Sequence, residues 1–330
     1  MLLTPSTIAL VLSSIMAGAV ALVATLNAVR ILTRWNRDRG SGDQILLESR
    51  TYLVSTSFAF AMVLQILSLS LFVGMAQRAH VLFDGAMCAA GTLNVNPFGF
   101  PALILKLVNA ILCGVWLSVN HADNRSIDQP LLKFKYAWVP VITALILAEG
   151  WLQFRYFLGM DPDIITSCCG TIFSEDAGSA GGDLAHLPFV PMRIVFYFLA
   201  FVALAAGARF VKTGKGALFF SLASAAFLPV SIVSIISFIS PAIYELPTHH
   251  CPFCFLQREY FFVGYPMYIS LLGASAAGIS LGILQPFAKT GPSGQVIRKV
   301  QSRLGAAAFA GFAAFILISS YFVLFTGLVM

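Results

Sequence analysis

The feature that constrains the fold most is a series of apolar runs, each about twenty residues long or longer, the length that a helix needs to cross a bilayer. In hydrocarbon every backbone polar group must be hydrogen-bonded within the protein, so only helices and closed barrels span a membrane. Barrel strands are shorter and alternate between apolar and polar residues, whereas these runs are continuous. We therefore expect an all-α protein, a polytopic integral membrane bundle of about eight transmembrane helices. The spans are predicted at residues 7–29, 53–76, 100–120, 137–159, 189–211, 217–240, 255–284 and 304–328.

The composition supports a single transmembrane domain over 1–330 and excludes a nucleic-acid partner. Only 10% of the residues are charged and mean hydropathy is +0.87, whereas soluble domains have about 25% charged residues. In a soluble chain the net charge of +6 would point to an anionic partner. Here it reflects the basic loops that orient membrane helices, and membrane lipid is the expected surrounding.

Most of the 20 Lys and Arg residues lie in every second connection between the predicted spans. Basic loops stay on the cytoplasmic side, so these connections are expected inside and both termini outside, in an inner or plasma membrane. The first run has no preceding Lys or Arg and no compact cleavage signal, so we expect a retained helix rather than a signal peptide. The predicted cytoplasmic loops are about 30–52, 121–136, 212–216 and 285–303, and the extracytoplasmic loops are about 77–99, 160–188 and 241–254.

Five of the six cysteines then fall in extracytoplasmic connections: Cys88, Cys168, Cys169, Cys251 and Cys254. Disulfides persist outside the cytoplasm, so this segregation predicts thiol chemistry or a thiolate site on the outer face. Static disulfides that pin outer loops would give the same distribution. The remaining cysteine lies inside a span, where a thiol usually acts as a small apolar side chain.

The adjacent pair Cys168-Cys169 lies in the longest outer loop, 160–188, which contains five acidic residues and no Lys or Arg. Loops of this length are usually functional or mobile. A disulfide between neighbouring residues is strained. The two cysteines are therefore expected to bond elsewhere, to bind a soft metal, or to exchange disulfide partners.

The stretch "HHCPFCFLQREY" carries a Cys-x-x-Cys motif, Cys251 and Cys254, at the predicted start of the seventh span. A helix N-terminus presents unpaired N–H groups and partial positive charge, which favour a thiolate and lower its pKa. Cys251 is then the expected nucleophile. His249, His250 and Arg258 add positive potential. The pattern predicts a redox pair, because structural zinc sites usually need four ligands in two pairs.

This motif, together with outer-loop cysteines, resembles the vitamin K epoxide reductase family and, more distantly, the quinone-linked membrane oxidants of disulfide-forming pathways. The segment "CAAGTLNVNPFGFPALILKL" adds to the resemblance, because it looks like that family's loop cysteine, Cys88, followed by Thr92 and a Gly-x-Pro that begins a helix. The resemblance covers part of the chain, and the family's core is a bundle of four helices.

The resemblance implies a thiol–disulfide relay between an extracytoplasmic thiol protein and a membrane quinone. Cys251 and Cys254 would face the quinone, while Cys88 and one of Cys168 or Cys169 would form the shuttle that contacts the partner protein.

Aromatic and charged residues supply candidate contacts for the quinone. Tyr260 and Tyr265 follow the motif and could stack on the ring, beside Arg258, although aromatic residues at helix ends are often interfacial anchors. Lys106 and Glu149 fall inside predicted spans, where an ionisable group costs roughly 2.5–3.5 kcal/mol to insert and is usually paired or functional. Glu149 would either pass protons to a reduced quinone or pair with Lys106 or Arg155.

Two other functions remain open. The first is an extracytoplasmic protein that binds or transports copper, mercury or zinc, since cysteine and histidine are good ligands for soft metals. Its candidate ligands are His249, His250, Cys251, Cys254, Cys168 and Cys169. The second is a non-catalytic subunit of a larger membrane complex with structural disulfides. No covalent haem is expected, because Phe255 stands where a C-x-x-C-H site has histidine.

Overall fold

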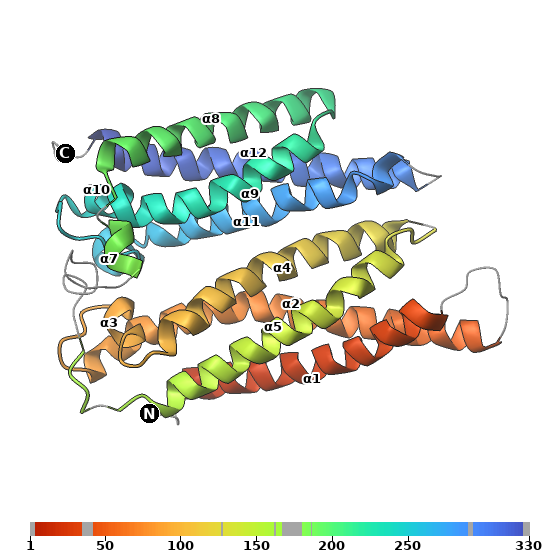
Figure 1. The fold of residues 1–330 in the computed structure, drawn as a ribbon, viewed down its shortest axis with the longest axis horizontal. Coiled ribbons are helices and arrows are strands. Elements are labelled where there is room, and N and C mark those ends of the chain that lie inside the picture. The colour runs from red at the N-terminus through yellow and green to blue at the C-terminus, as the bar shows by residue number, and fades with distance from the viewer. Residues whose placement is uncertain are drawn as a thin grey trace. The chain divides into compact units, whose positions relative to one another are not determined.

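A computed structural model describes residues 4–34, 42–126, 128–161, 163–166, 180–185, 187–289 and 293–325 (Figure 1). Within these ranges all regular secondary structure is helical, and eight helices are long and apolar enough to cross a membrane, which confirms the all-α, eight-span prediction. The α-helices are α1 (Pro5–Arg34), α2 (Gly42–Ala79), α3 (Ala89–Leu93), α4 (Gly99–Arg125), α5 (Leu132–Leu158), α7 (Ala180–Ala185), α8 (Phe189–Thr213), α9 (Ala217–Ser234), α10 (Ser240–Tyr244), α11 (Gly264–Leu284) and α12 (Gly294–Phe325).

The chain divides into two compact units. The first comprises Met1–Met75, Asn96–Met160 and Pro286–Arg298. The second comprises Ala76–Val95, Asp161–Gln285 and Lys299–Met330. The prediction of a single domain and that of the membrane orientation both stay predictions.

The core of the first unit is formed by α1, α2, α4 and α5, with α5 packed against both α1 and α4 (Figure 1). Alanines of α1, Ala17, Ala21, Ala24 and Ala28, are buried in it and allow close helix approach, as small residues do in membrane bundles. Larger side chains of the other helices fill the space between them, among them the edge-to-face pair Phe58 and Trp116.

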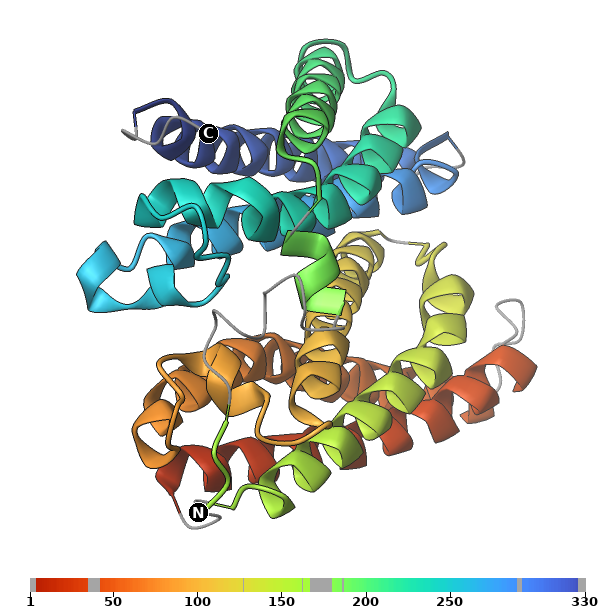
Figure 2. The same ribbon diagram turned by 60° about the vertical axis from the view of Figure 1, so that its left-hand side comes forward.

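In the second unit α9 packs against both α8 and α11 (Figure 2). The contact between α9 and α11 depends on glycine: a Cβ on Gly278 would lie 2.2 Å from Ser224 Oγ, and one on Gly282 would lie 2.5 Å from Ser221 Oγ. Ser221 Oγ also donates to the carbonyl of Ile279 at 3.0 Å. Backbones that approach this closely are typical of small-residue interfaces between membrane helices.

The start of the seventh span was predicted wrongly, because we expected the helix from residue 255 but α11 begins at Gly264. Two other helices begin well before their predicted spans, α2 at Gly42 instead of 53 and α12 at Gly294 instead of 304, so parts of the predicted cytoplasmic loops 30–52 and 285–303 are helical. The residues that precede α11 form two short 3₁₀ helices, η4 (Cys254–Leu256) and η5 (Arg258–Tyr260), followed by Phe261 and Phe262 with positive φ. Left-handed backbone at two successive residues cannot continue a right-handed helix. Averaged hydropathy concealed this break, because the apolar residues on either side of Gln257, Arg258 and Glu259 outweigh these three polar residues.

Gly264 permits the connecting segment to fold back onto α11. A Cβ at this position would lie 2.5 Å from Phe255 Cδ2 and 2.7 Å from Leu256 Cδ2. Only glycine tolerates such close approach. The segment that follows the Cys-x-x-Cys motif is thus packed on the first turn of α11 instead of extending the helix.

Candidate functional site: a buried cluster of three cysteines

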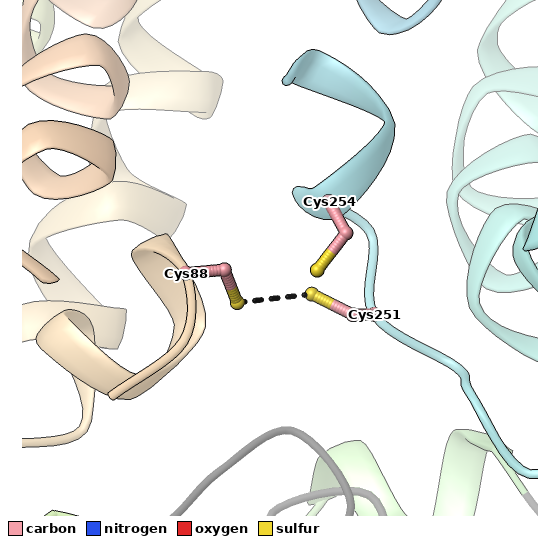
Figure 3. A group of neighbouring side chains, drawn as sticks. All are labelled: Cys88, Cys251 and Cys254. Carbon is pink, nitrogen blue, oxygen red and sulfur yellow. Dashed lines mark hydrogen bonds between the residues drawn. The ribbon is translucent and has the colours of Figure 1, made fainter. Parts of the chain in front are cut away.

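Three cysteines converge in the second unit: Cys88, Cys251 and Cys254. Their Sγ atoms all lie within 4.8 Å of one another, and all three side chains are buried. Figure 3 shows the three sulfurs pointing toward one another, Cys88 from the start of α3, Cys251 from the segment that leads into η4, and Cys254 from the first residue of η4. The Sγ atoms of Cys88 and Cys251 are 3.4 Å apart, which is contact rather than the roughly 2.05 Å of a disulfide bond.

Local structure on both sides of Cys88 holds it in place. Cys88 is the N-cap residue of α3, and the side-chain oxygen of Gln77, on α2, accepts a hydrogen bond from the N–H of Ala89 at 3.1 Å. On the other side Thr166 Oγ1 donates to the carbonyl of Gly91 at 2.8 Å. The short helix that carries Cys88 is therefore fixed by a residue from each of the two segments that flank it in the unit.

A tight turn just before Cys88 lets the Thr166 segment approach. The N–H of Thr166 donates to the carbonyl of Asp84 at 3.0 Å. Gly85 has φ +86°, and a Cβ there would lie 2.3 Å from the Thr166 carbonyl oxygen. Both the backbone conformation and the close contact require glycine.

Two tyrosines position the Cys-x-x-Cys segment through its backbone. Tyr244, the last residue of α10, donates from Oη to the carbonyl of Cys251 at 2.6 Å and accepts from the N–H of Phe255 at 3.0 Å. Tyr268, on α11, donates from Oη to the carbonyl of Pro252 at 2.7 Å, and its ring stacks on that of Phe255. These bonds satisfy backbone groups that no regular helix satisfies here, and they fix the orientation of both thiols.

Of the two histidines that precede the motif, His249 contacts a thiol of the cluster. Its Nε2 lies 3.4 Å from Cys254 Sγ, and its ring meets Tyr244 edge to face, with centroids 4.6 Å apart. His250 Nδ1 lies 2.9 Å from the carbonyl oxygen of Ile236, in the π-helix η3 (Ile235–Ile239) that joins α9 to α10. The sequence placed the two histidines together, but the fold directs them to different groups.

The later start of α11 removes one predicted source of thiol reactivity. The motif does not form the first turn of a transmembrane helix, and Pro252 lies before a 3₁₀ helix of three residues. Such a short element supplies little of the partial charge that aligned peptide dipoles give a long helix. We therefore expect the contact with His249, rather than a helix N-terminus, to influence the reactivity of Cys254.

The predicted aromatic residues follow the motif closely, Tyr260 in η5 and Tyr265 in α11. Tyr260 meets Tyr244 edge to face at 4.8 Å between centroids, and Tyr265, in the first turn of α11, is exposed. Arg258 is exposed as well. Partial burial, and then negative charge on Cys254, Glu259 and Cys251, raises the pKa of Tyr260 above its ordinary value, so its phenol stays protonated at neutral pH.

Lys106 and Glu149 belong to the first unit and bind each other. Lys106 Nζ lies 2.6 Å from Glu149 Oε1 and donates to Ser68 Oγ at 3.1 Å. Asn109 Nδ2 donates to Glu149 Oε2 at 3.0 Å, and Gln65 Nε2 donates to the same oxygen. Of the two pairings considered for Glu149, the one with Lys106 is confirmed.

Arg155, the other candidate partner, lies over the ring of Phe98 instead, with its guanidinium carbon 5.1 Å from the ring centroid. Cys168 and Cys169 lie outside the described residues.

Tyr244 is the residue that the sequence did not reveal, because a tyrosine at the end of an apolar run is typical of an interfacial anchor.

Comparison of the chain with known protein families, curated proteins and solved structures gives no match in any of the three. A fold class alone does not determine function. The function must therefore be argued from the chemistry of the cysteine cluster.

Proposed function

We propose that this protein is a membrane thiol–disulfide oxidoreductase that passes electrons between extracytoplasmic protein thiols and a membrane quinone. The observation that carries the proposal is the 3.4 Å contact between the Sγ atoms of Cys88 and Cys251, with Cys254 in the same cluster. Thiol–disulfide exchange needs an attacking sulfur in contact with the sulfur of a disulfide. A cysteine 163 positions away along the chain meets this requirement.

The exchange begins from the oxidised pair, with a disulfide between Cys251 and Cys254. The Cys88 thiolate attacks Cys251 Sγ, which forms a Cys88–Cys251 mixed disulfide and releases Cys254 as a thiolate. A second shuttle thiolate, from Cys168 or Cys169, then attacks Cys88 and releases Cys251. The shuttle disulfide oxidises the partner dithiol, and the reduced Cys251–Cys254 pair passes two electrons and two protons to the quinone, which becomes a quinol.

His249 is positioned to assist the step at Cys254. When Cys254 leaves as a thiolate, an imidazole Nε2 at 3.4 Å can donate a hydrogen bond to it or protonate it. When the pair is reoxidised, the same nitrogen can accept the thiol proton. A group that can give a proton to Cys254 and take it back suits an exchange that runs in both directions.

The quinone contact is assigned to the segment from η5 to the first turn of α11. Tyr260, Tyr265 and Arg258 lie within fourteen residues of the motif, and the exposed rings of Phe261 and Phe262 stand beside them. Aromatic rings suit the flat face of a quinone. Lys106 and Glu149 are left out of this contact, because both carboxylate oxygens of Glu149 already accept hydrogen bonds from side chains of the first unit.

Trapping of the mixed disulfide tests the exchange step. In a metal-free Cys254→Ser variant the same bond is approached from the other side: oxidised glutathione first converts Cys88 and a second shuttle cysteine to their disulfide, and the Cys251 thiolate then attacks Cys88 and releases the second shuttle thiolate. Without Cys254 the Cys88–Cys251 disulfide cannot pass on to a Cys251–Cys254 disulfide, so it should accumulate and appear as a crosslinked peptide pair in non-reducing mass spectrometry. Cys113→Ser is the matched control, because Cys113 is buried in the core of the first unit. Absence of the Cys88–Cys251 crosslink in a folded Cys254→Ser protein would rule out the proposed exchange.

The quinone requirement is tested separately by following the redox state of the cysteines. Membranes that contain the wild-type protein are depleted of quinone and then resupplied, and thiols are counted by the mass shift of an alkylating reagent. Cys251 and Cys254 should become reduced on depletion and oxidised on resupply. Thiol counts that do not respond to quinone would leave structural disulfides in a non-catalytic subunit as the better explanation.

A further inference from the structure

We infer that the reduced cluster is also a zinc site, with Cys88, Cys251 and Cys254 as its three protein ligands and the fourth position taken by a water molecule. In tetrahedral zinc sites with Zn–S bonds of about 2.3 Å, neighbouring sulfurs lie about 3.8 Å apart. The three sulfurs here lie within 4.8 Å of one another and the Cys88–Cys251 pair is 3.4 Å apart, so the tetrahedral value falls inside the observed range.

His249 lies beside the cluster but is not one of its ligands. Its Nε2 is 3.4 Å from Cys254 Sγ, but in the described part of the chain the ligand atoms that lie within 4.8 Å of one another are those of the three cysteines. His249 is therefore an outer-shell partner that can donate a hydrogen bond to the Cys254 thiolate. The ligand set differs from the one predicted from sequence, because Cys88 enters it and both histidines leave it, His250 being directed to the carbonyl of Ile236.

Charge favours a divalent ion such as zinc over monovalent copper at this site. Three thiolates around Zn²⁺ carry a net charge of −1, whereas the same ligands around Cu⁺ carry −2. Cys88 and Cys251 are fully buried, so the smaller net charge costs less to desolvate. Magnesium and calcium are excluded because they take oxygen ligands, and this set of protein ligands has none.

The surrounding residues hold the ligand segments in place independently of any metal. Gln77 fixes the backbone next to Cys88, and Tyr244 fixes the backbone on either side of Cys254 and packs against the ring of His249. Such outer-shell contacts orient metal ligands and raise affinity. The inference needs only reduced thiols and does not rest on the relay, and a disulfide within the cluster excludes the metal.

Metal titration of the reduced, chelator-treated full-length protein in detergent tests the site. Co²⁺ is the spectroscopic probe: we expect thiolate charge-transfer absorption that saturates at one Co²⁺ per chain and is abolished when Zn²⁺ displaces it. Cys88→Ser should weaken binding by more than the roughly 10–100-fold typical of losing an outer-shell partner, and His249→Ala by no more than that. Cys113→Ser should bind one metal as the wild type does.

Oxidation of the wild-type protein provides a test that needs no substitution. After a disulfide has formed in the cluster, the Co²⁺ absorption should disappear, and reduction should restore it. Reduced protein with titratable thiols but no stoichiometric Zn²⁺ would overturn the inference, and so would binding that survives Cys88→Ser and is lost in a Cys168→Ser/Cys169→Ser variant. The crosslink described above is measured in metal-free protein, so failure of the zinc site and failure of the relay are separate results.

Discussion

Removal of one partner from the buried Lys106–Glu149 pair should destabilise the first unit strongly. In Lys106→Met the carboxylate of Glu149 stays fully buried and loses the donor at 2.6 Å. Breaking a buried ion pair in this way costs about 3–5 kcal/mol, because an uncompensated charge remains. Gln65 and Asn109 still donate to Glu149, so we expect a value near the lower end, about 3 kcal/mol.

The double variant Lys106→Met/Glu149→Gln should recover much of this loss. It removes both charges together, and the amide that replaces Glu149 still accepts from Asn109. Replacing both members of a buried pair is often close to neutral, so we expect the double variant to be at least 1 kcal/mol more stable than Lys106→Met. Residues in direct contact give non-additive changes, and a double-mutant cycle measures the coupling.

Reversible unfolding in detergent, followed by helical circular dichroism, supplies the four free energies of the cycle. Lys133→Met is the matched control, because Lys133 is exposed on α5 and its loss should change the free energy of unfolding by less than about 0.5 kcal/mol. Two results would refute the reasoning: a cost below about 1 kcal/mol for Lys106→Met, or strictly additive effects in the double variant.

Three further predictions concern the second unit. Gly278→Ala should cost about 1–3 kcal/mol of stability, because the new Cβ would lie 2.2 Å from Ser224 Oγ. Gly273→Ala on the same helix should not destabilise, because its Cβ would meet nothing within 4 Å. Thermal unfolding compares the two variants, and equal effects would contradict the close packing of α9 and α11. Tyr244→Phe should cost about 1–3 kcal/mol of stability, because its hydroxyl donates a hydrogen bond to one backbone group of the motif and accepts one from the backbone N–H that follows it. It should also slow formation of the Cys88–Cys251 crosslink in the Cys254→Ser background. An unchanged crosslinking rate would show that this hydroxyl does not position Cys251. Ser234→Ala should be neutral or stabilising, because the buried Ser234 hydroxyl has no hydrogen-bond partner in the described parts of the chain; a loss of more than about 1 kcal/mol by thermal unfolding would mean that it has one.

Much of the fold was predictable because membrane spans are local features of a sequence. Each long apolar run satisfies its own backbone hydrogen bonds, so its helical state needs no distant partner. All eight spans were identified. The start of the seventh was placed too early because apolar residues flank Gln257, Arg258 and Glu259 in the irregular segment before Gly264. Hydropathy measures burial in hydrocarbon and does not detect positive φ at Phe261 and Phe262.

The candidate site was predictable in its chemistry and only partly in its members. Cysteine spacing and loop position identified Cys251, Cys254 and Cys88 as thiols of interest. Their mutual contact, the choice of His249 over His250 as the neighbour of Cys254, and the two backbone bonds of Tyr244 were not visible in the sequence. A tyrosine and two histidines beside an apolar run have several common roles, and residue type alone does not choose among them.

The sequence by itself determined that this chain is a polytopic helical membrane protein with cysteines concentrated in alternate connections. It did so because hydrocarbon imposes a length and an apolar composition on every span, and both can be read from consecutive residues. Only the tertiary structure decided that Lys106 pairs with Glu149 and that Cys88 meets Cys251 across 163 positions of chain. Contacts of that kind depend on how helices pack and how connecting segments turn, which consecutive residues do not specify.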